Sequence, residues 1–270
     1  MDKAFTFLKG NLPILISMPH AGTKLTEIVE RGLVDEAKSL PDTDWHIPRL
    51  YDFAKELGAN ILCAEYSRYV IDLNRSADDI PLYVGATTGL YPSTLFDGRP
   101  LFKPGLEPSA EERNQYLEHI WRPYHQKVRS ELDRLKREYG KAVLFDAHSI
   151  RSFIPYLFEG VLPDFNFGTN SGTSCCQELE SIVYASMGDD YTHVLNGRFK
   201  GGFITRGYGN PNDGIHAIQL ELAQKNYMDE IEPFRYRDDI APACQVQIKK
   251  ILESIKTWAN PKGQINQSRS

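Results

Sequence analysis

Two apolar segments of this chain each run into a histidine. The segment LISMPHAG leads to His20, and the segment KAVLFDAHSI leads to Asp146 and His148. A short continuous apolar run is typical of a strand that is covered on both faces of a sheet. In such sheets, ligands bind beyond the carboxyl ends of the strands. We therefore expect the two histidines to converge at one edge of a sheet.

Strand-like and helix-like segments alternate, which predicts an α/β fold with a mixed central sheet and helices on both faces. The expected strands are residues 12–18, 60–66, 69–73, 141–145, 193–196, 202–206 and 215–222. The expected helices are residues 43–57, 109–139, 174–187 and 238–258. Asp42 or Thr43 is expected to cap the first helix, and Pro123 to kink or split the second. No linker-like segment divides the chain, so residues 1–270 are expected to form one domain.

Residues 76–107 have no helical or strand periodicity and are punctuated by prolines and glycines. A long segment of this kind in a compact domain is commonly either functional or disordered. This one is also rich in Leu, Tyr and Phe. We therefore expect an ordered loop that covers the active site.

Composition excludes several classes of function. The net charge of −5 gives no sign of a nucleic-acid surface, although a small anionic substrate remains compatible with it. No apolar run approaches the roughly 20 residues that a membrane span requires. The first residues, MDKAFTFLKG, lack the apolar core of a secretion signal, and the four cysteines form no CxxC pair. These features favour a reduced, cytoplasmic protein.

The two histidines suggest a metal site. A catalytic zinc site commonly has three protein ligands and one open position, and His20 and His148 supply two of them. The segment PDTDWH offers the third as Asp44, with Asp42 and His46 as alternatives. Asp44 is preferred because Asp42 can act as a helix cap. Zn²⁺ is the expected metal, but such a ligand set also binds Co²⁺, Mn²⁺ or iron.

Two further carboxylates lie in strand patterns beside the predicted site. Asp146 precedes His148 by two residues and therefore points to the same side of a strand, where it can accept the imidazole N–H or bind the metal itself. Glu221 lies in the apolar segment IHAIQLELAQ, with Gln219 on the same side. Beside a metal, Glu221 can take a proton from water, while the alternative is a glutamate that faces solvent. The remaining histidines are expected to be structural: His119, His125, His193 and His216.

The segment SRYVIDLNR contains candidates for binding an anionic substrate. Arginine pairs with carboxylates through two hydrogen bonds and stays charged when partly buried. Arg68 and Arg75 occur here, with Asn74 beside the second and Asp72 placed to hold one guanidinium group. A surface salt-bridge cluster is the alternative.

The segments SMPHAG, DTDWH, SRYVIDLNR, DAHS and GIHAIQLE together resemble the N-formylglutamate amidohydrolase family. The resemblance covers about residues 12–222, and SRYVIDLNR and GIHAIQLE are its most specific parts. It implies a fold similar to that of zinc carboxypeptidases and aspartoacylases. It also implies hydrolysis of N-formyl-L-glutamate to formate and L-glutamate during histidine degradation. Those relatives place an acidic ligand three residues after the first histidine, where this chain has Thr23.

The resemblance also implies roles for individual residues. His20 and His148 match zinc ligands, and Arg68 matches an arginine that stabilises the carbonyl oxygen. Asn74 and Arg75 match a pair that binds a substrate carboxylate, and Glu221 matches the base. The second substrate carboxylate is assigned to Arg198 or Arg206, in the glycine-rich segment NGRFKGGFITRGYGN. The alternatives are a zinc amidase for another N-acyl amino acid or short peptide, and a protein that binds carboxylates without turnover.

Overall fold

The computed structural model describes residues 2–80 and 88–259, and its centre is a seven-stranded sheet in the order β1-β3-β2-β4-β7-β5-β6. The strands β3, β2, β4 and β7 run parallel, whereas β1 and the pair β5–β6 run in the opposite direction. The predicted mixed α/β sheet is therefore confirmed. The strands are β1 (Phe5–Leu8), β2 (Ile14–Met18), β3 (Asn60–Ala64), β4 (Ala142–Ile150), β5 (Phe165–Gly168), β6 (His193–Leu195) and β7 (Ile215–Ala223).

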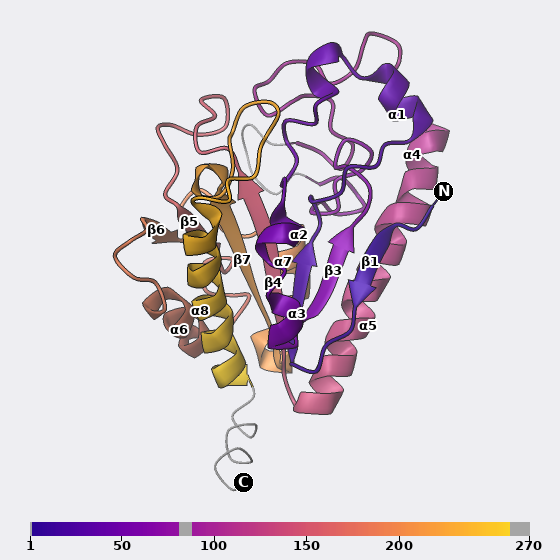
Figure 1. Cartoon of the computed structure of the whole chain (residues 1–270). Helices are drawn as coiled ribbons and strands as arrows, with labels where there is room; N and C mark the ends of the chain where they lie inside the picture. The colour runs from indigo at the N-terminus through magenta and orange to yellow at the C-terminus, as the bar shows by residue number, and fades with distance from the viewer. Residues whose placement is uncertain (1, 81–87, 260–270) are drawn as a thin grey trace, which may run out of the picture.

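Helices cover both faces of this sheet, as predicted, with α6 and α8 on the left of Figure 1 and α4 and α5 on the right. Side chains alternate between the two faces, so Phe145 of β4 packs in the cluster that includes α8, whereas Leu144 packs in the one that includes α5. The helices are α1 (Glu27–Gly32), α2 (Ile47–Leu50), α3 (Ala54–Leu57), α4 (Ala110–Tyr116), α5 (Arg122–Tyr139), α6 (Gln177–Ala185), α7 (Phe203–Tyr208) and α8 (Ala241–Ala259). Shorter 3₁₀ turns are η1 (Asp35–Ala37), η3 (Pro211–Asp213) and η4 (Gln224–Asn226).

The predicted helix over residues 43–57 is wrong, because the structure has the two short helices α2 and α3 instead. The residue before α2, His46, has a left-handed backbone with φ of 62°, which no helix continues through. Asp42 caps no helix. Its carboxylate accepts hydrogen bonds from the Tyr69 hydroxyl and the Phe96 amide.

The predicted helix over residues 109–139 is present and is divided near Pro123. Between α4 and α5 lies a π-helical turn, η2 (Leu117–Trp121). Proline has no amide hydrogen for the helical ladder, so Pro123 favours such an irregular turn just before it. Ser109 and Glu112 form a capping box at the start of α4, and Gly140 ends α5 with φ of 81°.

Other boundaries differ from the predictions. Residues 69–73 form turns and irregular backbone rather than a strand, and residues 202–206 lie largely in the helix α7. Short apolar runs fit either structure, and in α7 the buried residues Ile204, Thr205 and Tyr208 follow helical spacing. The strand β4 also continues through His148 instead of ending before it. The strands β1 and β5 and the helix α1 were not predicted.

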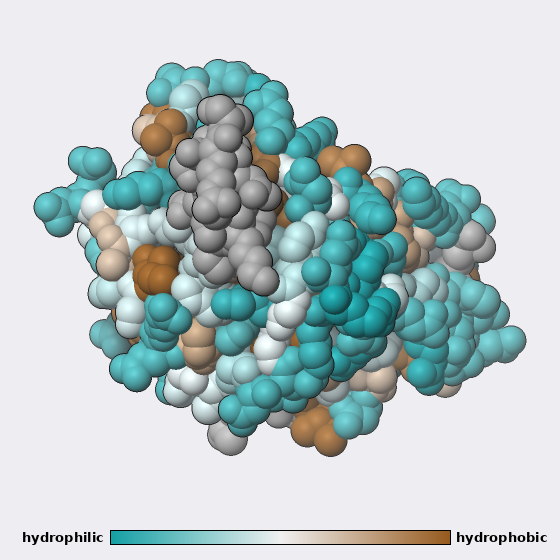
Figure 2. Space-filling model, turned by 90° about the horizontal axis from the view of Figure 1, so that it is seen from below, coloured by the Kyte–Doolittle hydropathy of each residue, from teal (hydrophilic) through white to brown (hydrophobic). Residues whose placement is uncertain are grey.

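Polar surface dominates the end of the molecule at which α5 and α8 finish. Seen from below, its apolar residues form small, separate areas (Figure 2). None of the helices in residues 2–80 and 88–259 is long and apolar enough to cross a bilayer.

Truncation of the core residue Leu144 tests the packing of α5 on the sheet. Leu144 is fully buried, so Leu144→Ala should lower the free energy of unfolding by about 2–5 kcal/mol. Urea denaturation measures this change. The control Val246→Ala removes an α8 side chain that is 68% exposed and should change stability by less than about 0.5 kcal/mol. Equal losses in both variants would contradict the assignment of Leu144 to the core.

Candidate active site

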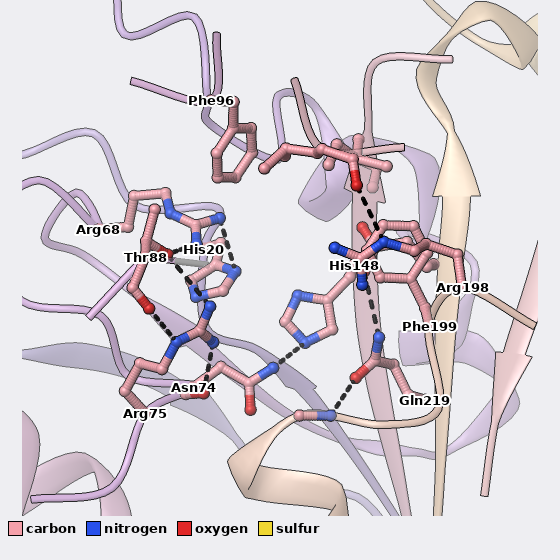
Figure 3. A pocket seen from close by; sticks show the side chains of 15 residues that line it. His20, Arg68, Asn74, Arg75, Thr88, Phe96, His148, Arg198, Phe199 and Gln219 are labelled. Atoms are coloured by element: carbon pink, nitrogen blue, oxygen red, sulfur yellow. Dashed lines mark hydrogen bonds between the residues drawn. The ribbon is translucent and has the colours of Figure 1, made fainter. Parts of the chain in front are cut away.

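A pocket lies where the parallel strands end, and it gathers most of the predicted site residues (Figure 3). They are His20, Arg68, Asn74, Arg75, His148, Arg198 and Glu221. Arg206 is not among the lining residues; its Nε donates to the Gly201 carbonyl. The site therefore combines residues from the first, middle and last thirds of the chain.

Three buried side chains at this pocket form a candidate metal centre. One potential ligand atom each from His20, Asp44 and His148 lies within 4.8 Å of the others. The carboxylate Oδ2 of Asp44 is 3.2 Å from Nδ1 of His148 and 3.9 Å from Nδ1 of His20. Two imidazole nitrogens and one carboxylate oxygen facing each other make up the donor set of a catalytic zinc site.

A second carboxylate contacts the far nitrogen of each imidazole. His20 Nε2 is 2.7 Å from Asp72 Oδ1, and His148 Nε2 is 3.1 Å from Asp146 Oδ2. Asp72 can accept the N–H at Nε2 of His20, whereas Nε2 of His148 lies near both Asp146 and, at 3.1 Å, Nδ2 of Asn74. Nδ1 of each ring is directed toward Asp44. This arrangement fixes the tautomer and the orientation of histidines that bind metals. Asp146 therefore points to the same side of β4 as His148, as predicted.

The two histidines differ in proton affinity. Burial, assisted by the nearby Arg68, lowers the pKa of His20, so its imidazole is neutral. Burial also acts to lower the pKa of His148, but the carboxylates of Asp146 and Asp44 raise it well above its usual value. Without a cation, His148 therefore carries a proton between two carboxylates. A metal that binds here has to displace that proton.

The backbone around Asp44 is irregular and is held by two side chains that follow β7. Gln224 Nε2 donates to the Thr43 carbonyl at 3.0 Å, and the Tyr227 hydroxyl donates to the Trp45 carbonyl at 2.9 Å. The alternative ligands point elsewhere: His46 Nε2 lies 2.6 Å from the Phe234 carbonyl, and the carboxylate of Asp42 pairs with Arg151 at 3.1 Å. Of the three candidates in PDTDWH, only Asp44 lies beside both His20 and His148.

Glu221 lies in β7 directly opposite His148 of β4. Gln219 Nε2 donates to its carboxylate at 3.1 Å, and the oxygen of Gln219 accepts from the Gly202 amide at 2.7 Å. Burial raises the pKa of Glu221 to about 8, and the nearby charge of His148 acts in the opposite direction. A buried carboxyl with a pKa near neutrality is suited to both accepting and donating a proton.

Arginines lie on two sides of His148 in the close view, with Arg68 and Arg75 on one side and Arg198 on the other (Figure 3). The guanidinium of Arg68 is 2.6 Å from Asp72 and stacks over the Phe96 ring. The Nε of Arg75 donates to the Thr88 carbonyl at 2.6 Å, and the Nε of Arg198 donates to the Leu157 carbonyl at 3.1 Å. The pocket therefore offers positive charge at two separate places.

Some of the pocket was not found from the sequence. Thr88 and Phe96 come from the predicted covering loop, whose residues 81–87 lie outside the described part of the chain; its covering role stays a prediction. Leu157 and Phe199 line the pocket without any sequence signal. Gly202 has a clear role, because a Cβ there would lie 2.3 Å from Nδ2 of Asn74. The absence of a side chain at residue 202 therefore leaves room for the Asn74 side chain.

Comparison with known proteins identifies the family. A model of the N-formylglutamate amidohydrolase family matches residues 12–228. The chain belongs to this family. An N-formylglutamate deformylase of Pseudomonas putida is 62% identical over 96% of this chain and 97% of that protein. One from Pseudomonas aeruginosa is 61% identical over 96% of this chain and 98% of that protein.

A solved N-formylglutamate amidohydrolase from Ralstonia eutropha JMP134 has the same fold, with a TM-score of 0.82. The alignment covers 96% of this chain and 99% of that one at 22% sequence identity. The resemblance that the sequence motifs suggested is thereby confirmed at the level of the amidohydrolase family and its fold.

Substitution of Asp44 and Asp42 separates the two candidate carboxylate ligands in this amidohydrolase. Asp44→Asn should weaken zinc binding by at least about 10-fold, because a carboxylate charge beside both histidines is lost. Asp42→Asn should bind zinc like the unsubstituted protein, since Asp42 contacts Tyr69, Phe96 and Arg151 instead. Zinc titration against a chelating dye measures both affinities. Unchanged affinity in Asp44→Asn, with native circular dichroism, would exclude Asp44 as a ligand.

Proposed function

We propose that this protein catalyses the metal-dependent hydrolysis of N-formyl-L-glutamate to formate and L-glutamate. Relatives that are 61–62% identical over nearly the whole chain are named N-formylglutamate deformylase, which supports the reaction. The observation that carries the proposal is one pocket that combines a candidate metal centre, the buried Glu221 and arginines at two places. Each part answers one requirement of the substrate or of amide hydrolysis.

The substrate has two carboxylates separated by a short chain, and the pocket has cations on two sides. We assign Arg75 with Asn74 to one carboxylate and Arg198 to the other, because all three line the pocket. Arg206 was the alternative for the second carboxylate, and its position outside the pocket lining favours Arg198. Arg68, whose guanidinium lies 3.3 Å from Nδ1 of His20, is assigned to the formyl oxygen.

We assign the metal to His20, Asp44 and His148, whose donor atoms fit a divalent cation. Zn²⁺ is the expected ion, with Co²⁺ and Mn²⁺ as alternatives, and a bound cation supplies charge that polarises a carbonyl and acidifies water. Asp72 accepts a hydrogen bond from His20, and Asp146 lies 3.1 Å from Nε2 of His148; these contacts at Nε2 keep Nδ1 of each ring directed toward the cation.

Glu221 moves the proton in this proposal. Its carboxylate takes a proton from the water that attacks the formyl carbon. As the carbon–nitrogen bond breaks, Glu221 gives this proton to the departing nitrogen of glutamate. One amide and one water thus yield formic acid and the amine, and the acid proton passes to the amine to give formate and the ammonium form of glutamate. Gln219 holds the carboxylate in place through its hydrogen bond at 3.1 Å.

Formate release from N-formyl-L-glutamate tests the reaction. Protein stripped with a chelator should be inactive, and activity should return with Zn²⁺ or Co²⁺. Glu221→Gln should keep the metal but lower kcat by about 10²–10⁴-fold, because it cannot accept a proton. An enzymatic formate assay and metal analysis measure both quantities.

A panel of N-formyl and N-acetyl amino acids serves as the comparison in the same assay. If another N-acyl amino acid is hydrolysed faster, that compound becomes the assigned substrate, and the proposed amide hydrolysis still holds. Tight binding of N-formyl-L-glutamate without any turnover by the zinc-loaded protein would indicate a carboxylate-binding protein.

Paired substitution of the two arginines tests the second carboxylate site. Arg198→Ala should raise KM for N-formyl-L-glutamate by about 10–100-fold with a smaller change in kcat, since a charged hydrogen bond to the substrate is lost. The matched variant Arg206→Ala should stay within about 3-fold of the unsubstituted KM. Steady-state kinetics at saturating zinc give these values. A larger effect in Arg206→Ala would reverse the assignment.

A further inference from the structure

Two side chains outside the pocket hold the backbone on either side of Asn74. Trp121 Nε1 donates to the Arg75 carbonyl at 2.9 Å, and His125 Nε2 lies 2.9 Å from the Leu73 carbonyl. Trp121 ends the π turn η2 and His125 follows one helical turn later, in α5. Neither lines the pocket that contains Asn74 and Arg75. The backbone that carries Asn74 and Arg75 is thus held by two side chains that lie outside the pocket.

The rings of these two residues form a stack that continues into α7. The Trp121 and His125 rings are stacked with centroids 3.8 Å apart, and His125 is nearly parallel to Tyr208 of α7. The start of α7 also contacts Asn74, because the Ile204 amide donates to its side-chain Oδ1 at 2.8 Å. The aromatic stack therefore joins the two helices that position Asn74.

The direction of each hydrogen bond at His125 follows from its partners. A carbonyl can only accept, so Nε2 of His125 carries the hydrogen and donates to Leu73. The other nitrogen, Nδ1, lies 2.8 Å from the Tyr208 hydroxyl and accepts from it. Burial lowers the pKa of His125 to about 3, so this neutral form persists across the physiological pH range.

We propose that Trp121 and His125 are positioning residues, which hold Asn74 and Arg75 in the conformation that binds a substrate carboxylate. This inference rests on the proposed function, which makes Asn74 and Arg75 substrate-binding residues. Residues 73–75 form a turn and a bend, and no strand within residues 2–80 and 88–259 pairs with them. The carbonyl groups of Leu73 and Arg75 instead accept hydrogen bonds from the side chains of His125 and Trp121.

Single substitutions that remove one donor each test the proposal. Trp121→Phe keeps a ring but removes the N–H, and His125→Leu removes the donor to Leu73. Each should raise KM for N-formyl-L-glutamate about 5- to 50-fold, with kcat within about 3-fold and unchanged zinc content. His125→Gln should restore most of the lost affinity, because its amide nitrogen reaches a position close to that of Nε2. A purely structural role would give no such rescue.

The matched control is Trp258→Phe, which removes an indole hydrogen bond to Glu178 on α6, away from the pocket. It should leave KM unchanged. Since Trp121 is only partly buried, Trp121→Phe should fold even if His125→Leu does not. Unchanged KM in Trp121→Phe, together with unchanged exchange in the same variant as measured below, would overturn the proposal.

Amide hydrogen exchange separates this inference from the proposed function. Trp121→Phe should speed exchange in a peptide covering residues 72–76 by about 5-fold or more, without change in a peptide covering β4. If the unsubstituted protein releases no formate, the proposed function fails, and exchange alone decides the positioning role. Faster exchange confined to residues 72–76 would then support it, and unchanged exchange would refute it.

Discussion

The parallel pairing of β4 with β7 is the constraint on which the rest of the site depends. It sets His148 opposite Glu221 and Asp146 opposite Gln219, on the face of the sheet toward α7. A shift of one residue in either strand would turn these polar side chains into the apolar cluster on the other face. Because both faces are covered by helices, the register is fixed by apolar packing along the whole length of both strands.

The site buries several charged side chains, and burial by itself would destabilise their charged forms. Arg68, Asp72 and His20 contact one another, and Asp44, His148 and Asp146 form a second chain of contacts. Each buried charge is therefore stabilised by a neighbour of opposite sign. Within residues 2–80 and 88–259, Glu221 has no such close partner, and burial raises its pKa. The contrast between paired and unpaired carboxylates explains why one of them is suited to moving protons.

Two of the side chains proposed to bind the metal or the substrate lie on irregular backbone, and both are held in the same manner. The carbonyls that flank Asp44 accept hydrogen bonds from Gln224 and Tyr227, and those that flank Asn74 accept from His125 and Trp121. In each case the donors come from elements distant in the sequence. Irregular backbone lacks the repeating hydrogen bonds of a helix or strand, so such side chains supply its rigidity. A rigid position is what a metal ligand or a carboxylate-binding residue requires.

The α/β class, the amidohydrolase family and most of the residues that meet in the pocket could be predicted from the amino-acid sequence. These follow from local signals: apolar periodicity, polar residues after apolar runs, and motif spacing. Local signals misassigned residues 69–73 and 202–206, because a short apolar run fits a turn, a strand or a helix equally well. Contacts between distant segments were needed to place Asp44, rather than Asp42 or His46, beside both histidines, and Arg198, rather than Arg206, in the pocket lining. Those choices depend on where irregular segments cross in space, which contacts between distant parts of the chain determine.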